Sequence, residues 1–158
     1  MLKRLNKNKN GFTIIELVIV ISVISLFFIL SIIGLNITRR KSRDSKRLND
    51  VKQIQEALDL YFNDKSFYPA SLRFDSKLGS SYGSMLCFEG FVIDDSECMT
   101  LGKTYMPIVP KNPLPRGIEY TYKQLSSGLD YELGFVVEGR IEDLSPFVIH
   151  YGHSNGIK

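Results

Sequence analysis

An apolar run near the N-terminus constrains this chain more than any other feature. Between residues 12 and 37, 19 of 26 residues are apolar and a single one, Glu16, is charged. Its charge-free part, Leu17 to Leu35, supplies 19 residues, close to the roughly 20 that a helix needs to cross a bilayer core. A chain of 158 residues with such a segment has room for one membrane helix and one modest domain. We therefore do not expect a large enzyme, a repeat array or a wholly disordered chain.

The run does not fit a secretory signal peptide. The apolar part of a signal peptide spans about 7–15 residues and ends in a small-residue cleavage site. Here the run is longer, and the first alanine of the chain is Ala57. We therefore expect that ordinary secretory cleavage does not remove this segment.

The net positive charge of the chain comes from its first eleven residues. They carry four basic side chains and no acid, whereas the remainder carries 16 basic and 17 acidic residues. The formal charge of +3 is therefore no evidence for nucleic-acid binding.

Glu16 stands one turn inside the apolar run. A carboxylate in a membrane helix costs up to about 2.5–3.5 kcal/mol, which makes it a functional candidate whose natural partner is a cation. If the chain were cut after Gly11, the new amino group of Phe12 would lie four residues from Glu16. The terminus and the carboxylate could then pair, within one chain or between neighbours.

The segment Gly11-Phe12-Thr13-Ile14-Ile15-Glu16-Leu17 resembles the processing motif of type IV pilins and type II secretion pseudopilins. The resemblance rests on the glycine before the cut, the phenylalanine after it, and the glutamate at the fifth mature position. It implies a prepilin whose leader, residues 1–11, is removed by a membrane prepilin peptidase between Gly11 and Phe12. The same enzyme would N-methylate Phe12, and Glu16 would serve assembly.

The resemblance also implies location and partners. The chain would cross the cytoplasmic membrane once, with its head outside, and join an inner-membrane assembly platform. It would form a homopolymeric extracellular pilus or an extracytoplasmic pseudopilus. Charge counting alone does not give this orientation, because six basic residues between 39 and 47 follow the apolar run. The outside position of the head is therefore taken from the resemblance.

Helical signals continue beyond the membrane segment. Apolar residues at three- and four-residue steps predict an amphipathic helix, giving one helix over about 13–62 whose first half is apolar. Asp44 and Arg47 have the spacing of an i,i+3 ion pair. The expected apolar face comprises Leu48, Val51, Ile54, Leu58, Tyr61 and Phe62, and the expected polar face Asp44, Arg47, Asn49, Asp50, Lys52, Gln53 and Glu56.

The basic run from Arg39 to Arg47 has three interpretations at this stage. It could be a solvated collar at the membrane surface, whose side chains extend into water. It could attract anionic lipid headgroups. It could also pair with acids of neighbouring subunits in a filament.

Residues 63–117 are rich in glycine, serine and proline and predict loops. They hold the chain's two cysteines, Cys87 and Cys98, which would close a small disulfide ring outside the cytoplasm and stabilise it by roughly 3 kcal/mol. Free or buried thiols remain the alternative. Three acids lie inside this ring, and a solvated loop is favoured over a calcium site because their spacing fits no fixed oxygen-ligand pattern: Asp94, Asp95 and Glu97.

From Gly117 the apolar period changes to two, which predicts antiparallel strands. Residues 118–123 and 131–138 alternate around a turn at 126–130, and residues 146–151 form a possible third strand that begins at Pro146. The predicted fold class is therefore α+β and pilin-like, with a small antiparallel sheet on the C-terminal half of the long helix. The expected organisation is leader 1–11, membrane helix 12–37, amphipathic helix 38–62 and head 63–158. Within the head we expect loops over 63–117, a β-meander over 118–151 and a tail.

No catalytic or cofactor site is visible in the sequence. The two histidines, His150 and His153, fit an ordinary tail better than a metal site, and no nucleophile–base set or phosphate-binding loop appears. We therefore expect a structural subunit, with no enzyme activity, cofactor or metal. The alternative is a single-pass membrane protein with a small binding or sensing head that never polymerises.

Overall fold

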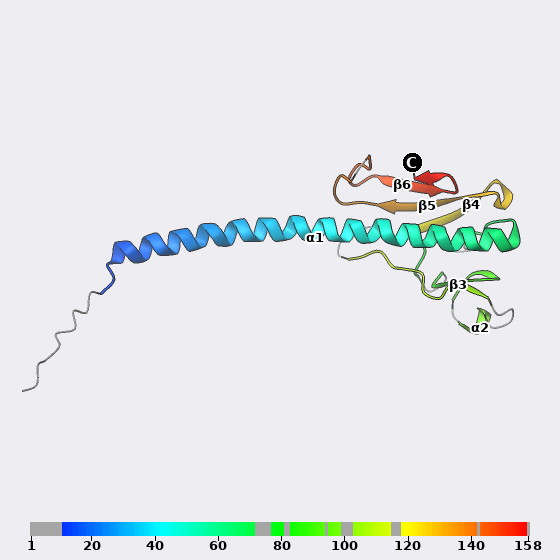
Figure 1. Ribbon diagram of the computed structural model, residues 1–158, viewed down its shortest axis with the longest axis horizontal. Coiled ribbons are helices and arrows are strands. Elements are labelled where there is room, and N and C mark those ends of the chain that lie inside the picture. Colours follow the sequence, from blue (N-terminus) through cyan, green and yellow to red (C-terminus); the bar gives the residue numbers. More distant parts are fainter. Residues whose placement is uncertain are drawn as a thin grey trace, which may run out of the picture. The chain divides into compact units, whose positions relative to one another are not determined.

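The structure, a computed structural model, describes residues 11–71, 77–80, 83–93, 95–98, 103–114, 118–141 and 143–157. The leader residues 1–10 lie outside this set. The chain divides into two compact units, Met1–Arg39 and Arg40–Lys158. In chain order the elements are α1 (Ile14–Lys65), β1 (Met85–Cys87), β2 (Gly90–Val92), α2 (Asp95–Cys98), β3 (Thr104–Met106), β4 (Thr121–Leu125), η1 (Ser126–Gly128), β5 (Asp130–Val136), β6 (Ile149–His153) and β7 (Gly156–Ile157) (Figure 1).

Helix α1 extends three residues beyond its predicted end at Phe62. The carboxylate of Asp64 accepts hydrogen bonds from Lys103 and from the Tyr105 hydroxyl, the latter at 2.6 Å, and these tertiary contacts hold the last turn. Ser66 then takes a left-handed φ of 62° and donates its backbone N–H to the Phe62 carbonyl at 2.7 Å. The predicted end was too early because its stabilising partners lie about forty residues further along the chain.

In the first unit, every described residue is exposed. The polar side chains of its helical part bond locally: Ser22, Ser25 and Ser31 each donate a hydroxyl to the carbonyl four residues earlier at 2.8 Å. Their hydrogen-bonding needs are met inside the helix, which lowers the cost of placing them in lipid. By length and composition, α1 contains one segment able to cross a membrane, with a mean hydropathy of 3.0 and none of it buried.

The second unit contains the predicted hairpin. Strands β4 and β5 pair antiparallel, with Tyr122 opposite Leu133, and the sheet continues in the order β4-β5-β6-β7. The predicted alternation is confirmed, because the residues of one face are all buried: Tyr120, Tyr122, Tyr131, Leu133, Phe135 and Val137. One long helix followed by antiparallel sheets is the α+β arrangement expected from the sequence.

The prediction of loops throughout residues 63–117 was wrong. This stretch contains a second antiparallel sheet in the order β2-β1-β3 and the short helix α2. Each of its strands has only three residues, and all of β1 is buried. Segments this short cannot display an alternation of apolar and polar residues, so the period-two signal was absent.

The end of the chain also differs from the prediction. The third strand exists but covers Ile149–His153, because Pro146, Phe147 and Val148 lie in a turn before it. The expected tail adds the short strand β7, paired to β6 around a turn at Ser154 and Asn155. Gly152 belongs to β6 and lies opposite both Leu133 and Ile157.

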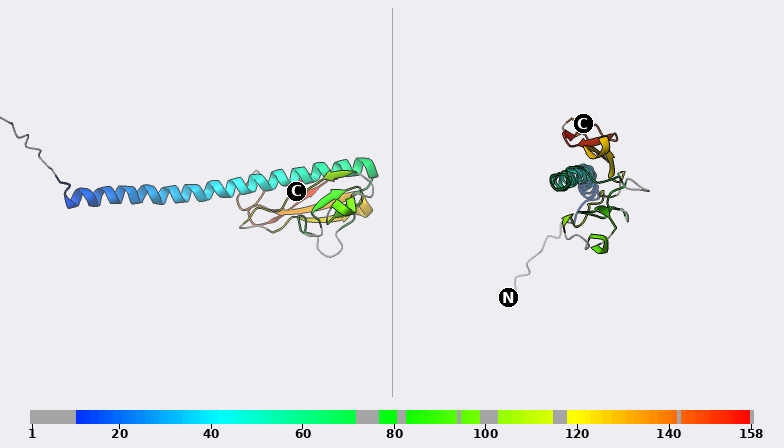
Figure 2. Two further views of the ribbon diagram at one scale, coloured as in Figure 1. Left: turned by 90° about the horizontal axis from the view of Figure 1, so that it is seen from below. Right: turned by 90° about the vertical axis from the view of Figure 1, so that its right-hand side faces the viewer.

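Both sheets contact the part of α1 that belongs to the second unit, and Figure 2 shows them on different sides of it. The predicted apolar face is confirmed, since Val51, Ile54, Leu58 and Tyr61 are buried in the core, while Leu48 and Phe62 pack at its edge. The predicted polar face was wrong at three residues that are also buried: Asp44, Arg47 and Asp50.

Candidate functional site

The segment before α1 is an accessible, non-helical stretch. Residues 11–13 have no regular structure, and Phe12 is 82% exposed. A Cβ built on Gly11 would meet nothing within 4 Å. The bond between Gly11 and Phe12 is therefore open to a partner that binds the chain in an extended form.

Thr13 and Glu16 form a capping box at the start of α1. The Glu16 carboxylate accepts the Thr13 backbone N–H at 3.1 Å and the Thr13 hydroxyl at 3.0 Å. In return, the Thr13 hydroxyl accepts the backbone N–H of Glu16 at 3.3 Å. This reciprocal arrangement satisfies backbone groups that would otherwise lack partners, and it fixes the helix start at Ile14.

The sequence prediction considered only a cation as partner for Glu16. The structure gives Glu16 a partner inside its own chain, and the signal for it was present as the spacing Thr-x-x-Glu. The cap lies directly beside Phe12, whose amino group a cut after Gly11 would free. The Glu16 carboxylate thus caps the start of the helix within a few residues of Phe12.

A buried ionic cluster lies in the second unit, at the first turns of its part of α1. We define it as Arg43, Asp44, Arg47, Glu138 and Asn112. Arg47 is fully buried, and its guanidinium contacts Asp44 Oδ1 at 2.5 Å, Glu138 Oε1 at 2.9 Å and Asn112 Oδ1 at 2.8 Å. Arg43 binds Glu138 through two parallel hydrogen bonds of 2.8 and 2.6 Å.

The cluster joins α1 to the chain after β5. Asp44 accepts the backbone N–H groups of Glu138 and Gly139 at 2.9 and 2.8 Å, and the Pro113 carbonyl accepts from Arg47 at 3.2 Å. Among the described residues, no buried side-chain nitrogen or oxygen lacks a hydrogen-bond partner. The i,i+3 pair of Asp44 and Arg47 is therefore confirmed, but it is an interior contact. The solvated-collar interpretation is wrong for Arg47.

Electrostatics within the cluster favour the ionised carboxylate. Hydrogen bonds from Arg43, together with those from Arg47, lower the pKa of Glu138 to about 2 despite its burial. A few residues along α1, burial raises the pKa of Asp50, and the hydrogen bond that Asp50 accepts from the Tyr120 hydroxyl at 2.9 Å offsets this in part. The buried polar residues of α1, Asp44, Arg47 and Asp50, thus precede its buried apolar residues, which begin at Val51.

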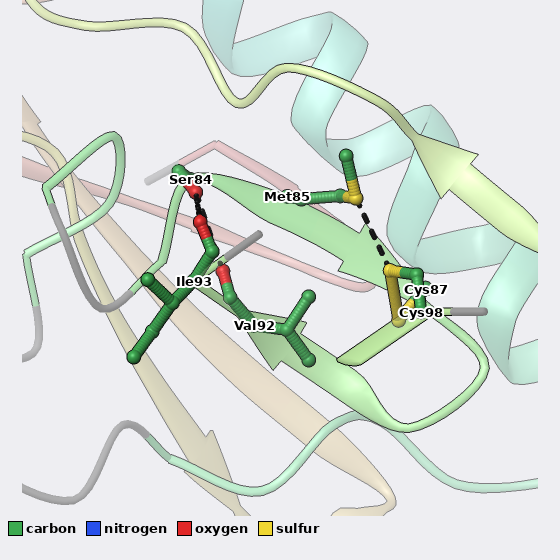
Figure 3. Close-up of a disulfide and its surroundings, with 6 residues drawn as sticks. All are labelled: Ser84, Met85, Cys87, Val92, Ile93 and Cys98. Carbon is green, nitrogen blue, oxygen red and sulfur yellow. Dashed lines mark hydrogen bonds between the residues drawn. A yellow bond between two sulfur atoms is a disulfide. The ribbon is translucent and has the colours of Figure 1, made fainter. Parts of the chain in front are cut away.

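The sulfur atoms of Cys87 and Cys98 are joined in a disulfide in the structure, with Cα atoms 5.8 Å apart (Figure 3). Figure 3 shows Met85 pointing at the bridge, with its sulfur 3.1 Å from the Cys98 sulfur. Together with Val92 these residues form a small buried cluster separate from the main core. Asp94 and the side chains of Asp95 and Glu97, which the sequence analysis weighed as calcium ligands, lie outside the described residues.

The two histidines lie in strand β6. His150 is buried, and its Nε2 is 2.8 Å from the Ser145 carbonyl. His153 is 3.8 Å from Asp130. Within the described part of the chain, no group of three or more histidine, cysteine, aspartate or glutamate side chains could hold a metal ion.

A family model described as the prokaryotic N-terminal methylation motif matches residues 6–33. This motif is the signature of type IV pilins and pseudopilins, and the match includes Gly11, Phe12, Glu16 and most of the apolar run. No curated protein and no solved structure matches the chain. The match covers the N-terminal segment and does not extend into the head.

Proposed function

We propose that this chain, which carries the type IV pilin and pseudopilin signature, is a prepilin-type structural subunit. A prepilin peptidase would remove residues 1–11 and N-methylate Phe12, and the mature chain would polymerise with copies of itself. The filament would be a type IV pilus or a pseudopilus of the type II secretion kind, built on an inner-membrane assembly platform. The observation that carries the proposal is the agreement between the motif and the capped start of α1.

Processing fits the geometry before α1. A peptidase holds its substrate in an extended form, and residues 11–13 lack helical structure because the cap at Thr13 begins the helix only at Ile14. Hydrolysis of the bond after Gly11 would leave a carboxylate on the leader and an amino group on Phe12. The glycine, which has no side chain, suits a narrow cleft at the membrane face.

Membrane anchoring follows from the segment after the cap. Its length and hydropathy suffice for one crossing, and its hydroxyl groups bond inside the helix. The coarse picture of a membrane-anchored protein with a head domain thus rests on the apolar helix and the motif together. The position of the head outside the cytoplasm belongs to the proposal.

Assembly would use the carboxylate of Glu16. Lipid and apolar side chains are similarly apolar, so packing alone specifies little axial register between identical helices. A buried carboxylate that needs a cationic partner does specify the axial register, because an unpaired charge in that environment costs several kcal/mol. We infer that Glu16 meets the amine of Phe12, its own or that of the preceding subunit.

Intact mass of the chain purified from cells with the peptidase tests the processing step. We expect a mature chain that starts at Phe12, and a variant Gly11→Leu that keeps Met1 and stays in the membrane. Gly34→Ala is the matched control, since a Cβ at Gly34 also meets nothing within 4 Å and should leave cleavage unchanged. A native chain that keeps its first eleven residues would identify a plain membrane anchor and overturn the proposal.

A further inference from the structure

Two loops of the second unit lie beside its first helical turns. One is the connection between β5 and β6, held through the hydrogen bonds of Glu138 and Gly139 to Asp44. The other follows β3 and is held through the hydrogen bonds of Asn112 and Pro113 to Arg47. Figures 1 and 2 show both loops at the end of the unit where its part of α1 begins.

These loops present large apolar side chains to solvent. Leu114 is 84% exposed, Phe147 65%, Ile118 53% and Val148 51%. The Asn112 side chain donates to the Ile118 carbonyl at 2.5 Å, which ties Ile118 to the same asparagine that contacts Arg47. Exposed apolar groups concentrated in one region mark an interaction surface more often than isolated ones do.

Phe147 is held in an uncommon conformation. Its φ of 59° lies in the left-handed region, which bulky side chains rarely adopt. Its backbone N–H donates to the Val137 carbonyl at 2.9 Å, so the fold retains this geometry. Strain of this kind, at a bulky side chain that is 65% exposed, favours a contact function for the outward position of Phe147.

Exposed basic side chains occur on the adjoining part of α1 and in the β5–β6 connection. Arg40, Lys41 and Lys46 on α1 and Arg140 after β5 are exposed. Two acids of the same region, Asp44 and Glu138, form ion pairs with Arg43 and Arg47 inside the ionic cluster. The remaining described acids of the loops are Glu119, which pairs with Lys77 at 3.5 Å, and Asp143.

We propose that this basal surface, defined as Leu114, Ile118, Phe147 and Val148 with Arg40, Lys41 and Arg140, docks on an anionic phospholipid bilayer. The apolar side chains would enter the interfacial layer, and the cations would pair with lipid headgroups. The inference rests on membrane anchoring of the chain and does not require filament assembly.

Chain connectivity selects lipid as the partner. The apolar run ends at Leu35, five residues before Arg40, so a bilayer that contains the run brings its headgroup layer to the start of the second unit. Attraction amounts to about 1 kcal/mol for each basic residue near an anionic surface. Tethering makes this docking intramolecular, so modest attraction suffices. Docking would orient the head on the membrane before a subunit enters a filament.

Fluorescence of the full chain reconstituted in vesicles tests the proposal. Leu114→Cys places an environment-sensitive probe on the basal surface, and Leu129→Cys is the matched control, an exposed leucine in the turn after η1. The vesicles contain phosphatidylcholine alone or mixed with phosphatidylglycerol, plus a lipid with a spin label on its acyl chain. We expect blue-shifted emission and quenching for the Leu114 probe only, and more strongly with phosphatidylglycerol.

Charge variants complete the design. Arg40→Gln and Lys41→Gln should each reduce the docked fraction by up to about fivefold, whereas Lys52→Gln, an exposed lysine further along α1, should not. Equal quenching of both probes, or equal quenching in the two kinds of vesicle, would overturn the proposal. Quenching that rises with protein density at fixed lipid would instead assign the surface to a second copy and also overturn it.

Failure of this inference is distinguishable from failure of the proposed function. Docking is measured on the uncut chain, whereas processing is read from the mass of the same protein after treatment with peptidase. A chain that is cut normally but does not dock would reject the lipid surface alone. A chain that docks but is never cut would reject the prepilin assignment alone.

Discussion

Asp44 and Arg47 form an ion pair in which both side chains are almost completely buried, with 2.5 Å between Oδ1 and Nη1. Both residues lie on the helix face that contacts the chain after β5, where Asp44 also accepts two backbone N–H groups. Removal of two charges from water is costly, and the cost is recovered only when every donor and acceptor has a partner. The pair therefore helps to specify how the second unit's part of α1 packs against the chain after β5.

Arg47→Ala is predicted to destabilise the second unit by about 3–5 kcal/mol, because it leaves buried carboxylates without their cation. Thermal unfolding of the full chain in detergent, followed by near-ultraviolet circular dichroism, measures the loss. Lys52→Ala changes an exposed side chain of the same helix and should stay within about 0.5 kcal/mol of the parent. Equal stability of the two variants would contradict the role given to the cluster.

Stability should depend on pH through Glu138. Its pKa is lowered from 4.5 to about 2, so its ionised form stabilises the fold fully above about pH 4.5. That contribution is lost as the pH falls from 4.5 toward 2, and it amounts to about 3 kcal/mol at 1.4 kcal/mol per pKa unit.

Glu138→Gln should therefore show a shallower loss of stability with acid than the parent chain. Unfolding temperatures measured at a series of pH values through this window give both slopes. Asp143→Asn, which removes an exposed carboxylate of the same connection, is the control and should retain the parent slope. Parallel slopes for the parent and Glu138→Gln would show that Glu138 is not held ionised by its arginines.

Glu16 has two separable roles. Glu16→Gln removes the charge but retains a side chain able to complete a capping box, whereas Glu16→Ala removes both. We predict that both variants are cut after Gly11, that neither assembles normally, and that only Glu16→Ala loses helix at the N-terminus, at a cost of about 1 kcal/mol. Filament yield by electron microscopy and hydrogen exchange at the first turn separate the roles. Normal filaments from a strain with only Glu16→Gln subunits would leave the charge without a function.

The bridge of Cys87 and Cys98 is predicted to form once the head leaves the cytoplasm. Non-reducing mass analysis of the mature chain should show two hydrogens fewer than the reduced chain, and Cys98→Ser should lower stability by roughly 3 kcal/mol. Labelling of both thiols in freshly isolated filaments would contradict this. The same sample, denatured and reduced before labelling, provides the positive control.

Part of the candidate site was readable from the sequence because its determinants are local. Gly11, Phe12 and Glu16 lie within six residues, and the cap between Thr13 and Glu16 follows from their spacing even though it was not predicted. The hairpin could be predicted for the same reason, since alternation of apolar and polar residues over five or more positions indicates a strand with one buried face. The three-residue strands around the disulfide gave no such signal.

The sequence by itself determined the membrane-length helix, the N-terminal methylation motif, the β4–β5 hairpin and the apolar face of α1, since each depends on residue types a few positions apart. Tertiary structure alone decided that Asp44 and Arg47 are interior. A polar residue on a helix is buried only when a partner offsets its desolvation, and here the partner Glu138 follows Asp44 by 94 residues. It likewise decided that the loops carrying Leu114 and Phe147 lie against the same turns of α1, because Arg47 binds one of them and Asp44 binds the other.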